Sequence, residues 1–369
     1  MKVTLNKDEL QRRLADIQSI VEKKTTMPIL SHFLLDLKRQ RSFIYATDLE
    51  VAIKEPIEVE AFEEEGLYCV SARKLYEIAK ELEGDVRLEG DGTEWVRLRS
   101  GHSNFRIACL NPEDYPHWPH RDDNKKLTIN SKTLLDMIEK TIYCAGENDP
   151  RYALNGVLLH CFGEKGRAIM VGTDSHRLAV VSKEVTMDFA DEVKVIVPRK
   201  AVFELKRILT GLDEDLSVEI SKNHIHFTIG EKEFLTKIIE GSYPGYEQVI
   251  PVNNDKILLA NREEFIRTLR RVSVIGREKS RAIRFEIGQG ELNVSVSDPE
   301  IGEASDSMGI EFSSDNPIVV GFNGKYLLET LMTMESERVS ISFMDSLNPT
   351  LIRQEDSDEY RCVLMPMRI

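Results

Sequence analysis

The chain has 369 residues, more than one hydrophobic core usually supports, and this length favours two or three domains. Hydrophobic residues make up 41% and charged residues 30%, which is typical of a folded globular protein and excludes a disordered one. The formal net charge of −14, taken alone, argues against nucleic-acid binding, because affinity for DNA comes largely from Lys and Arg that release counterions from phosphates.

The sequence shows no sign of export or membrane insertion. Its first ten residues, MKVTLNKDEL, lack the apolar core of a signal peptide, and no run of about 18 apolar residues occurs. The five cysteines are scattered and form no C-x-x-C pair: Cys69, Cys109, Cys144, Cys161 and Cys362. We therefore expect a cytoplasmic protein with free thiols and without a disulfide framework or a cysteine-rich zinc site.

Amphipathic helices are predicted in three pairs. The first helix of each pair follows a polar Asn, at Asn6, Asn130 and Asn261, with spacings of 124 and 131 residues. The second helices lie in VSARKLYEIAKEL, VPRKAVFELKRIL and GFNGKYLLETLMTM. In chain order, the six helices are placed at residues 6–24, 71–83, 131–145, 199–210, 262–281 and 323–338. The stripe expected to pack inward from the first helix is Leu10, Leu14, Ile17 and Val21.

A turn motif recurs between the two helices of each pair. TDLE begins at Thr47, TDSH at Thr173 and SDPE at Ser297, each after an alternating run typical of a strand. A Tyr-Pro turn ends the first two repeats, in NPEDYPHWP and GSYPGYEQVIP. Because these landmarks keep one order, we predict three α+β domains, each with two helices packed on antiparallel sheets. Their bounds are placed at residues 1–124, 125–252 and 253–369.

Positive charge is concentrated in the predicted helices. These six segments carry 23 Lys and Arg against 16 Asp and Glu, a net charge of +7, whereas the rest of the chain carries −21. If the helices faced one direction, they would present a basic surface suited to a polyanion. The alternative is a set of ordinary solvated helix faces. No zinc finger, recognition helix or RNA-binding aromatic motif supports base-specific reading.

The most enzyme-like cluster is Asp174, Ser175 and His176 in the second turn motif. Neighbours at a tight turn point in different directions, and Asp48 and Asp298 occupy the same repeat position without a histidine. A turn-capping carboxylate is therefore the favoured interpretation. The prolines around His117 and His120 exclude a helix, and no third metal ligand has suitable spacing, so the motif YPHWPH predicts a surface loop. Phosphate-binding glycine motifs are absent from the sequence.

Three apolar segments could line a binding pocket. They are Leu178 after the second turn motif, the Tyr243-Pro244 turn and the stretch Val363–Met367, whose methionines would suit several peptide ligands. Ordinary core or edge packing is the alternative.

Five motifs together resemble the bacterial DNA polymerase III beta subunit family, the processivity clamps: RYALNGVLL, VGTDSHRLAV, VIVPRKAVFEL, YPGYEQVIP and VLMPMRI. The resemblance covers all three repeats. It implies a head-to-tail homodimer whose six similar domains form a ring around duplex DNA, without cofactor, metal or catalytic residue. The implied partners are duplex DNA, the replicative DNA polymerase, the clamp loader, and other polymerases and repair proteins that bring short apolar peptides.

The resemblance also implies site residues. For DNA binding they are Lys24, Arg73, Asn148 and Tyr152, with Lys200 added from its repeat position. For the partner-peptide pocket they are Leu154, Thr173, Ser175, His176, Arg177, Leu178, Pro244, Val249, Leu347, Pro349, Val363, Met365 and Met367.

Four positions depart from the family pattern. Ser175 stands for a commoner Gly, Gln248 for a commoner Arg, Ala153 for a second Tyr and His102 for an Arg, which affects partner preference and DNA contact. Two rival functions are a hydrolase or nuclease that uses Asp174 and His176, and a clamp-like scaffold that serves repair proteins as a duplicate copy.

Overall fold

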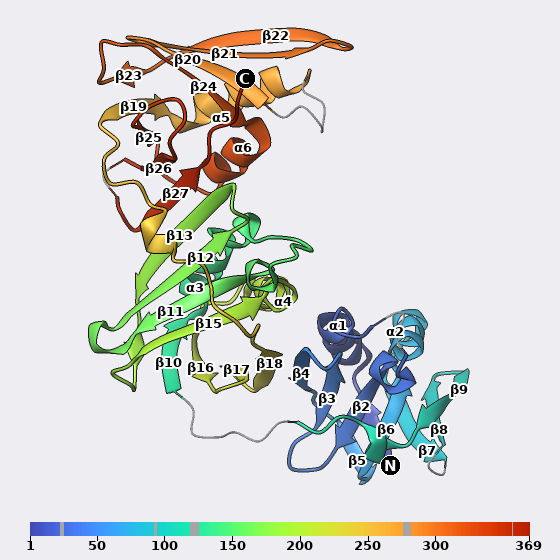
Figure 1. The fold of residues 1–369 in the computed structure, drawn as a ribbon. Helices are drawn as coiled ribbons and strands as arrows, with labels where there is room; N and C mark the ends of the chain where they lie inside the picture. The colour runs from blue at the N-terminus through green and yellow to red at the C-terminus, as the bar shows by residue number, and fades with distance from the viewer. Residues whose placement is uncertain (23–25, 92–93, 119–124, 276–281, 356) are drawn as a thin grey trace. The chain divides into compact units, whose positions relative to one another are not determined.

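The computed structural model describes residues 1–22, 26–91, 94–118, 125–275, 282–355 and 357–369. These residues form two compact units, one made of 1–132, 187–189 and 207–238 and the other of 133–186, 190–206 and 239–369. Both units combine helices with antiparallel sheets, so the α+β class is confirmed (Figure 1).

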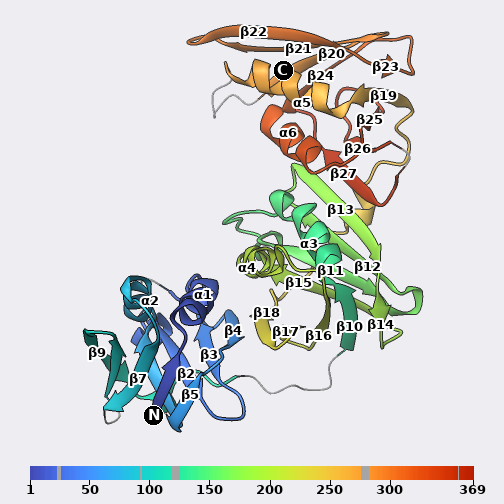
Figure 2. The same cartoon turned by 180° about the vertical axis from the view of Figure 1, so that it is seen from behind.

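In the first unit, one long antiparallel sheet runs in the order β14-β10-β16-β17-β18-β4-β3-β2-β6-β9-β8-β7-β1-β5, with the short β14 (Thr186–Met187) at its end. Helices α1 (Lys7–Ile17) and α2 (Ala72–Glu81) pack side by side, α1 against β4 and α2 against β2 and β6 (Figure 2). The strands are β1 (Lys2–Leu5), β2 (His32–Leu37), β3 (Phe43–Thr47), β4 (Val51–Pro56), β5 (Ala61–Glu64), β6 (Gly66–Ser71), β7 (Val86–Asp91), β8 (Trp95–Ser100), β9 (Ser103–Leu110), β10 (Lys125–Asn130), β16 (Asp215–Ile220), β17 (His224–Ile229) and β18 (Lys232–Lys237).

The second unit holds two antiparallel sheets, in the orders β15-β11-β12-β13-β27-β26-β25-β19-β23 and β22-β21-β20-β24. Helices α5 (Arg262–Ser273) and α6 (Gly324–Met332) pack against each other, and α5 also covers β21 and β22. The other elements are α3 (Ser131–Glu139), α4 (Arg199–Leu209), β11 (Gly156–Phe162), β12 (Arg167–Thr173), β13 (Arg177–Glu184), β15 (Glu192–Pro198), β19 (Lys256–Asn261), β20 (Ala282–Ile287), β21 (Glu291–Asp298), β22 (Gly302–Gly309), β23 (Glu311–Phe312), β24 (Ile318–Asn323), β25 (Arg338–Phe343), β26 (Thr350–Gln354) and β27 (Tyr360–Leu364).

The asparagines predicted to precede the first helix of each repeat do cap it. The side chain of Asn6 accepts hydrogen bonds from the amides of Asp8 and Glu9 at 3.0 and 3.1 Å. Asn130 and Asn261 accept from amides in the first turns of α3 and α5 at 2.9 and 3.0 Å. Because the first helical amides have no partner within the helix, a polar side chain at this position fixes where each helix begins.

The predicted helices were too long at their C-terminal ends. The first ends at Ile17 instead of residue 24, and the chain then turns so that Ile20, not Val21, is fully buried. The third ends at Glu139 instead of residue 145, where the Thr141 hydroxyl donates to the Met137 carbonyl at 2.7 Å. Apolar spacing identifies the buried face, but local turns and side-chain bonds decide where a helix ends.

One strand pair joins each repeat to the next. In the first unit, β18 of the second repeat pairs antiparallel with β4 of the first, with Phe234 opposite Ile53. In the second unit, β27 of the third repeat pairs with β13 of the second, with Val363 opposite Leu178. Since β18 and β27 are equivalent in the repeat, as are β4 and β13, both junctions follow one plan.

Within the described part of the chain, no helix is long and apolar enough to cross a membrane. The five cysteines are free thiols, and four of them are buried.

Candidate functional sites

The helices of the second unit border a large hollow. Side chains of α3, α4 and α6 line a space of about 890 Å³. Its basic lining residues are Lys140, Arg151, Arg177, Arg199, Lys206 and Lys325, and its acidic ones are Asp136, Glu139, Glu147, Asp149, Asp174, Glu329 and Glu335. Opposite charges are paired, as between Lys206 and Glu139 at 2.9 Å. The lining of this space therefore contains many charged side chains but has a net charge close to zero, so it would bind a polyanion only weakly.

The excess of positive charge on helices persists with their observed bounds. The six helices carry 16 basic and 11 acidic residues, a net charge of +5. Most of that excess lies on α4, with four basic residues against one acidic residue, and on α5, with four against two.

The predicted DNA-binding residues fall in separate places. Lys24 lies outside the described residues. The Arg73 side chain on α2 is 82% exposed and forms an ion pair with Glu77 at 2.7 Å. Lys200 is exposed in the first turn of α4. The structure does not bring Arg73 and Lys200 together in one unit.

Asn148 and Tyr152 share one loop, between α3 and β11. Asn148 adopts a left-handed φ of 56°, and Tyr152 is 79% exposed. The loop is fixed from within, because Asn155 accepts from the Asp149 amide and donates to its carbonyl, both at 2.8 Å. Arg151 pairs with Asp149, whose pKa its hydrogen bonds lower to about 2. An exposed ring on an ordered loop is a surface on which a nucleic-acid base can stack.

The three turn motifs are the same capped turn. The carboxylate of Asp174 accepts from the amides of His176 and Arg177, both at 3.0 Å. Asp48 and Asp298 each accept from the corresponding two amides of their own turns. The carboxylate is therefore used to hold the turn, as predicted, and the turn provides no hydrolytic site. In the described residues, no cluster of three His, Cys, Asp or Glu could hold a metal ion.

Arg177 is buried on the helix side of its strand. Its guanidinium contacts Glu329 and the Tyr143 carbonyl and lies over the Tyr326 ring at 4.0 Å. Burial alone would lower the pKa of Arg177, but the nearby carboxylates of Glu329 and Asp174 raise it above its usual value. Side chains alternate along a strand, so Arg177 and Leu178 face opposite sides of the sheet. Arg177, one of the residues predicted for the peptide pocket, thus holds the turn from the helix side of the sheet.

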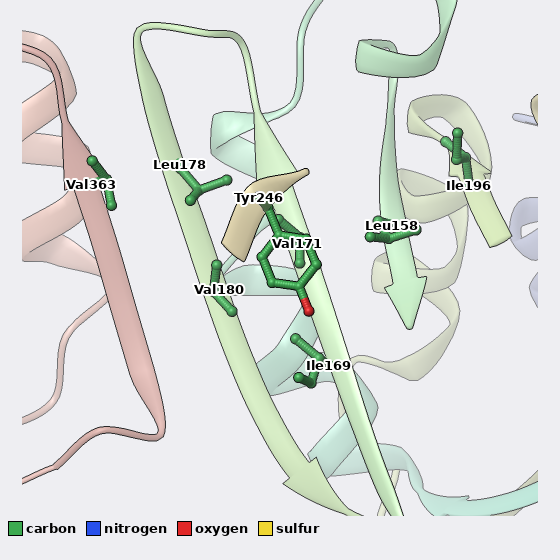
Figure 3. Close-up of a cluster of buried hydrophobic side chains, with 8 residues drawn as sticks. All are labelled: Leu158, Ile169, Val171, Leu178, Val180, Ile196, Tyr246 and Val363. Atoms are coloured by element: carbon green, nitrogen blue, oxygen red, sulfur yellow. The ribbon is translucent and has the colours of Figure 1, made fainter. Parts of the chain in front are cut away.

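Four neighbouring strands form the centre of the predicted pocket. Thr173 of β12 lies opposite Leu178 of β13, which lies opposite Val363 of β27, and Val363 lies opposite Leu351 of β26. Leu178 and Val363 belong to a buried apolar cluster with Val171, Val180 and Tyr246, drawn in Figure 3.

The next row carries the residues expected at the rim of the predicted pocket. The Met365 amide donates to the His176 carbonyl at 2.9 Å, and extending the β26–β27 register places Pro349 opposite Met365. Apolar side chains are unusually exposed here, at 36% for Met365 and 38% for Met367. The other expected pocket residues that are exposed are Ser175, His176, Pro244, Val249 and Leu347, whereas Leu154 is buried.

Sequence reasoning placed the Tyr243-Pro244 turn at the pocket but missed that Tyr246 covers one face of this sheet. The Tyr246 ring lies over Val171 of β12, and its hydroxyl bonds His160 at 2.9 Å (Figure 3). The Tyr243 hydroxyl donates to the Val171 carbonyl at 3.2 Å. The tyrosines of YPGYEQVIP, spaced by three, were the available signal, because both fix the Tyr-Pro turn onto the strand.

Comparison with known proteins covers the whole chain. The sequence matches the N-terminal, central and C-terminal domains of the DNA polymerase III beta subunit over residues 1–119, 128–245 and 247–368. It is 33% identical to the beta sliding clamp of Pseudomonas aeruginosa and 32% identical to that of Escherichia coli, each over the full length of both chains. A solved P. aeruginosa clamp bound to griselimycin superimposes with a TM-score of 0.94 at 32% identity, with both chains covered completely.

The three matches account for the three repeats, the shared turn and the absence of a catalytic arrangement at Asp174. The chain therefore belongs to the DNA polymerase III beta subunit family and acts as a beta sliding clamp, a non-catalytic processivity factor of DNA polymerase III.

Proposed function

We propose that two copies of this chain close head to tail into a six-domain ring that encircles duplex DNA. The observation that carries the proposal is the shared plan of the two internal junctions. Each pairs the last strand of one repeat with the strand after the turn of the preceding repeat. The remaining strands of these two types are β9 of the first repeat and β22 of the third. Among the described residues, β22 pairs only with β21, so its other edge is open.

The charges on these two strands are complementary. The edge that β22 would offer carries Glu303 and Asp306, whereas β9 carries Arg106 next to Arg97 of β8. Exposed apolar side chains accompany the acidic edge, with Ile301 at 49% and Val274 at 80% exposure. Opposite charges favour pairing of β22 of one copy with β9 of the other over pairing of two β22 or two β9 strands. Two such contacts between two copies close the assembly into a ring.

DNA contact is proposed to be weak and independent of sequence. The set is Lys24, Arg73, Asn148, Tyr152 and Lys200. Support comes from the positive excess on α4 and α5, the exposure of Arg73 and the ordered Tyr152 loop. Because the ring would hold DNA topologically, paired cations such as Arg73 suffice, and the clamp can slide.

Partner proteins are proposed to dock in the pocket built on Thr173, Leu178 and Val363. These partners are the replicative polymerase, the clamp loader, and other polymerases and repair proteins. An apolar floor with an exposed methionine rim fits a short extended peptide that inserts apolar side chains. The griselimycin-bound P. aeruginosa relative supports ligand binding by such clamps. A cytoplasmic location and domain bounds at 1–124, 125–252 and 253–369 complete the proposal.

The test is retention on nicked circular DNA after loading by a bacterial clamp loader. We expect the protein to stay through a high-salt wash and to leave when one restriction cut linearises the circle. Loss during the wash would mean ordinary electrostatic association and would reject the ring. Bovine albumin carried through the same steps controls for trapping.

A further inference from the structure

The first unit contains a second hollow, at the junction that repeats the plan of the partner pocket. It measures about 160 Å³ and lies where β4 meets β18. The lining comes from the first turn motif, the segment 115–118 and β17 and β18, with Tyr45, Leu49, Trp118, Leu235 and Lys237 among its residues. A cavity near 150 Å³ accommodates one benzene-sized group, so this space suits one apolar side chain.

The floors of the two sites are built from equivalent rows. In the partner pocket the row is Thr173, Leu178, Val363 and Leu351 on successive strands. In the second hollow, paired strands place the following residues in the same order: Thr47, Ala52, Leu235 and His226. The smaller side chain at Ala52 makes room above the floor.

The covering segments are also equivalent. The Tyr115 hydroxyl donates to the Tyr45 carbonyl at 3.2 Å, as Tyr243 does to Val171 at 3.2 Å. Three residues later, Trp118 lies edge-on to Tyr45 at 6.1 Å, in the place that Tyr246 takes in the other site. The turns match as well, because Leu49 and Ser175 have left-handed φ values of 76° and 73°.

The rims differ, and the difference defines the ligand. The Lys237 amide donates to the Glu50 carbonyl at 2.8 Å, so Lys237 stands where Met365 stands in the partner pocket. His224 lies opposite Lys237 and takes the place of Pro349. The apolar methionine and proline of the partner pocket are thus replaced, at one end of the hollow, by the cationic Lys237 and the imidazole of His224. Glu50, which replaces His176, lies across the strands from Lys237 on the side away from His224, and it puts a negative charge there.

We propose that this hollow is a second peptide-docking site, which takes a short extended segment with one leucine-sized or aromatic side chain and an adjacent carboxylate. The apolar side chain enters between Trp118 and Leu235, and the carboxylate reaches Lys237 and His224. Because Glu50 flanks Lys237 on one side and His224 flanks it on the other, a carboxylate is repelled on the Glu50 side and accepted on the His224 side, so the order of the two side chains along the peptide matters. The inference rests on the proposed partner pocket, since the repeat supplies the mode of binding.

The chain's two tryptophans allow a direct test in the full-length protein. Labelling with 5-fluorotryptophan gives two ¹⁹F resonances, of which Trp118 lines the hollow and Trp95 of β8 serves as the internal control. The Trp95→Phe variant assigns them. The probes are the capped pentapeptides Ac-Ser-Ser-Leu-Asp-Ser-NH2 and Ac-Ser-Asp-Leu-Ser-Ser-NH2, each with an Asn-for-Asp control.

We expect one of the two peptides to shift the Trp118 resonance saturably and to leave Trp95 unchanged. Its Asn control should bind about two- to five-fold more weakly, the range of an exposed ion pair. The Lys237→Glu variant should weaken the Asp peptide similarly and favour a Lys-for-Asp peptide. Lys237 is exposed, so the substitution should not disturb folding.

Three results would overturn the site. One is no Trp118 shift at about 10 mM peptide, a concentration at which even millimolar binding saturates. Another is an equal shift with sodium acetate, which would mean a simple anion site. The third is a shift lost in Met365→Glu but kept in Lys237→Glu, which would place the peptide in the partner pocket. The proposed partner pocket is tested separately: it would be rejected if the Met365→Glu variant supported normal polymerase processivity.

Discussion

Replacing Arg177 with Met should loosen the second unit where β13 meets β27. Arg177 is 9% exposed, and Met fills similar space, so the main loss is the buried charge and its bonds to Glu329 and the Tyr143 carbonyl. Breaking a buried ion pair costs about 3–5 kcal/mol, and the low end applies because Glu329 keeps 32% exposure and can regain water. We therefore expect the free energy of local opening to fall by about 3 kcal/mol.

Hydrogen exchange followed by mass spectrometry measures that loss. A change of about 3 kcal/mol corresponds to roughly 150-fold faster exchange in peptides that cover 171–184 and 358–364. The matched control is Arg353→Met, which removes an ion pair with Asp358 whose partners are 37% and 75% exposed. That pair should contribute about 0–1 kcal/mol, or at most about five-fold. If the two variants accelerate exchange equally, Arg177 does not support the pocket turn as argued.

Further expected outcomes concern the other sites. Arg73→Ala with Lys200→Ala should make the slope of log K against log salt shallower by about 0.9 for each phosphate that the variant no longer neutralises, and an unchanged slope would remove both from the DNA surface. Arg106→Pro should shift sedimentation toward monomer while Arg106→Ala shifts it far less. Among the described residues β6 pairs only with Cys109 and Leu110 of β9, so that side of β9 is unpaired at Arg106; the Arg106 amide faces it because the Cys109 amide donates toward β8 at 2.7 Å. Equal effects would exclude strand pairing there. Met365→Ala should weaken partner-peptide binding in a fluorescence-anisotropy titration without changing the unfolding temperature, since its side chain is already 36% exposed; unchanged affinity would remove it from the rim. Burial lowers the pKa of His160 below 6.5, so the unfolded chain takes up more protons and urea stability should fall from pH 6.5 downward; His160→Gln should flatten this fall, and parallel curves would contradict it.

The sequence predicted those parts of the fold that depend on local chemistry. An Asn before an apolar stripe marks a helix start wherever it occurs, and Asn6, Asn130 and Asn261 all proved to be caps. The turn-capping role of Asp48 and Asp174 was also correct, because an aspartate followed by two amides of a tight turn makes the same bonds in each repeat.

What sequence reasoning could not supply depends on strand pairing between distant segments. It grouped Arg177 with Leu178, although their alternation along β13 sends them to opposite faces. It compared Met365 with no residue of the second repeat, because the likeness to Lys237 appears only when both amides are seen to bond the preceding repeat's turn. Lys237 and Met365 have different side chains, but their amides form the same backbone hydrogen bond in the two repeats.

The capped turns at the proposed partner pocket and at the second hollow hold their rims in one conformation before any ligand binds. At Leu49 and Ser175 a non-glycine residue stays in the left-handed region, a conformation that costs of order 1 kcal/mol and persists only where neighbours fix it. The hydroxyls of Thr47 and Thr173 do so, each accepting from the amide two residues on at 3.0 and 3.1 Å. A peptide that docks at either proposed site would therefore order only itself, and a segment of a few residues would bind measurably and still dissociate quickly. Rapid exchange of partners on one clamp requires both properties.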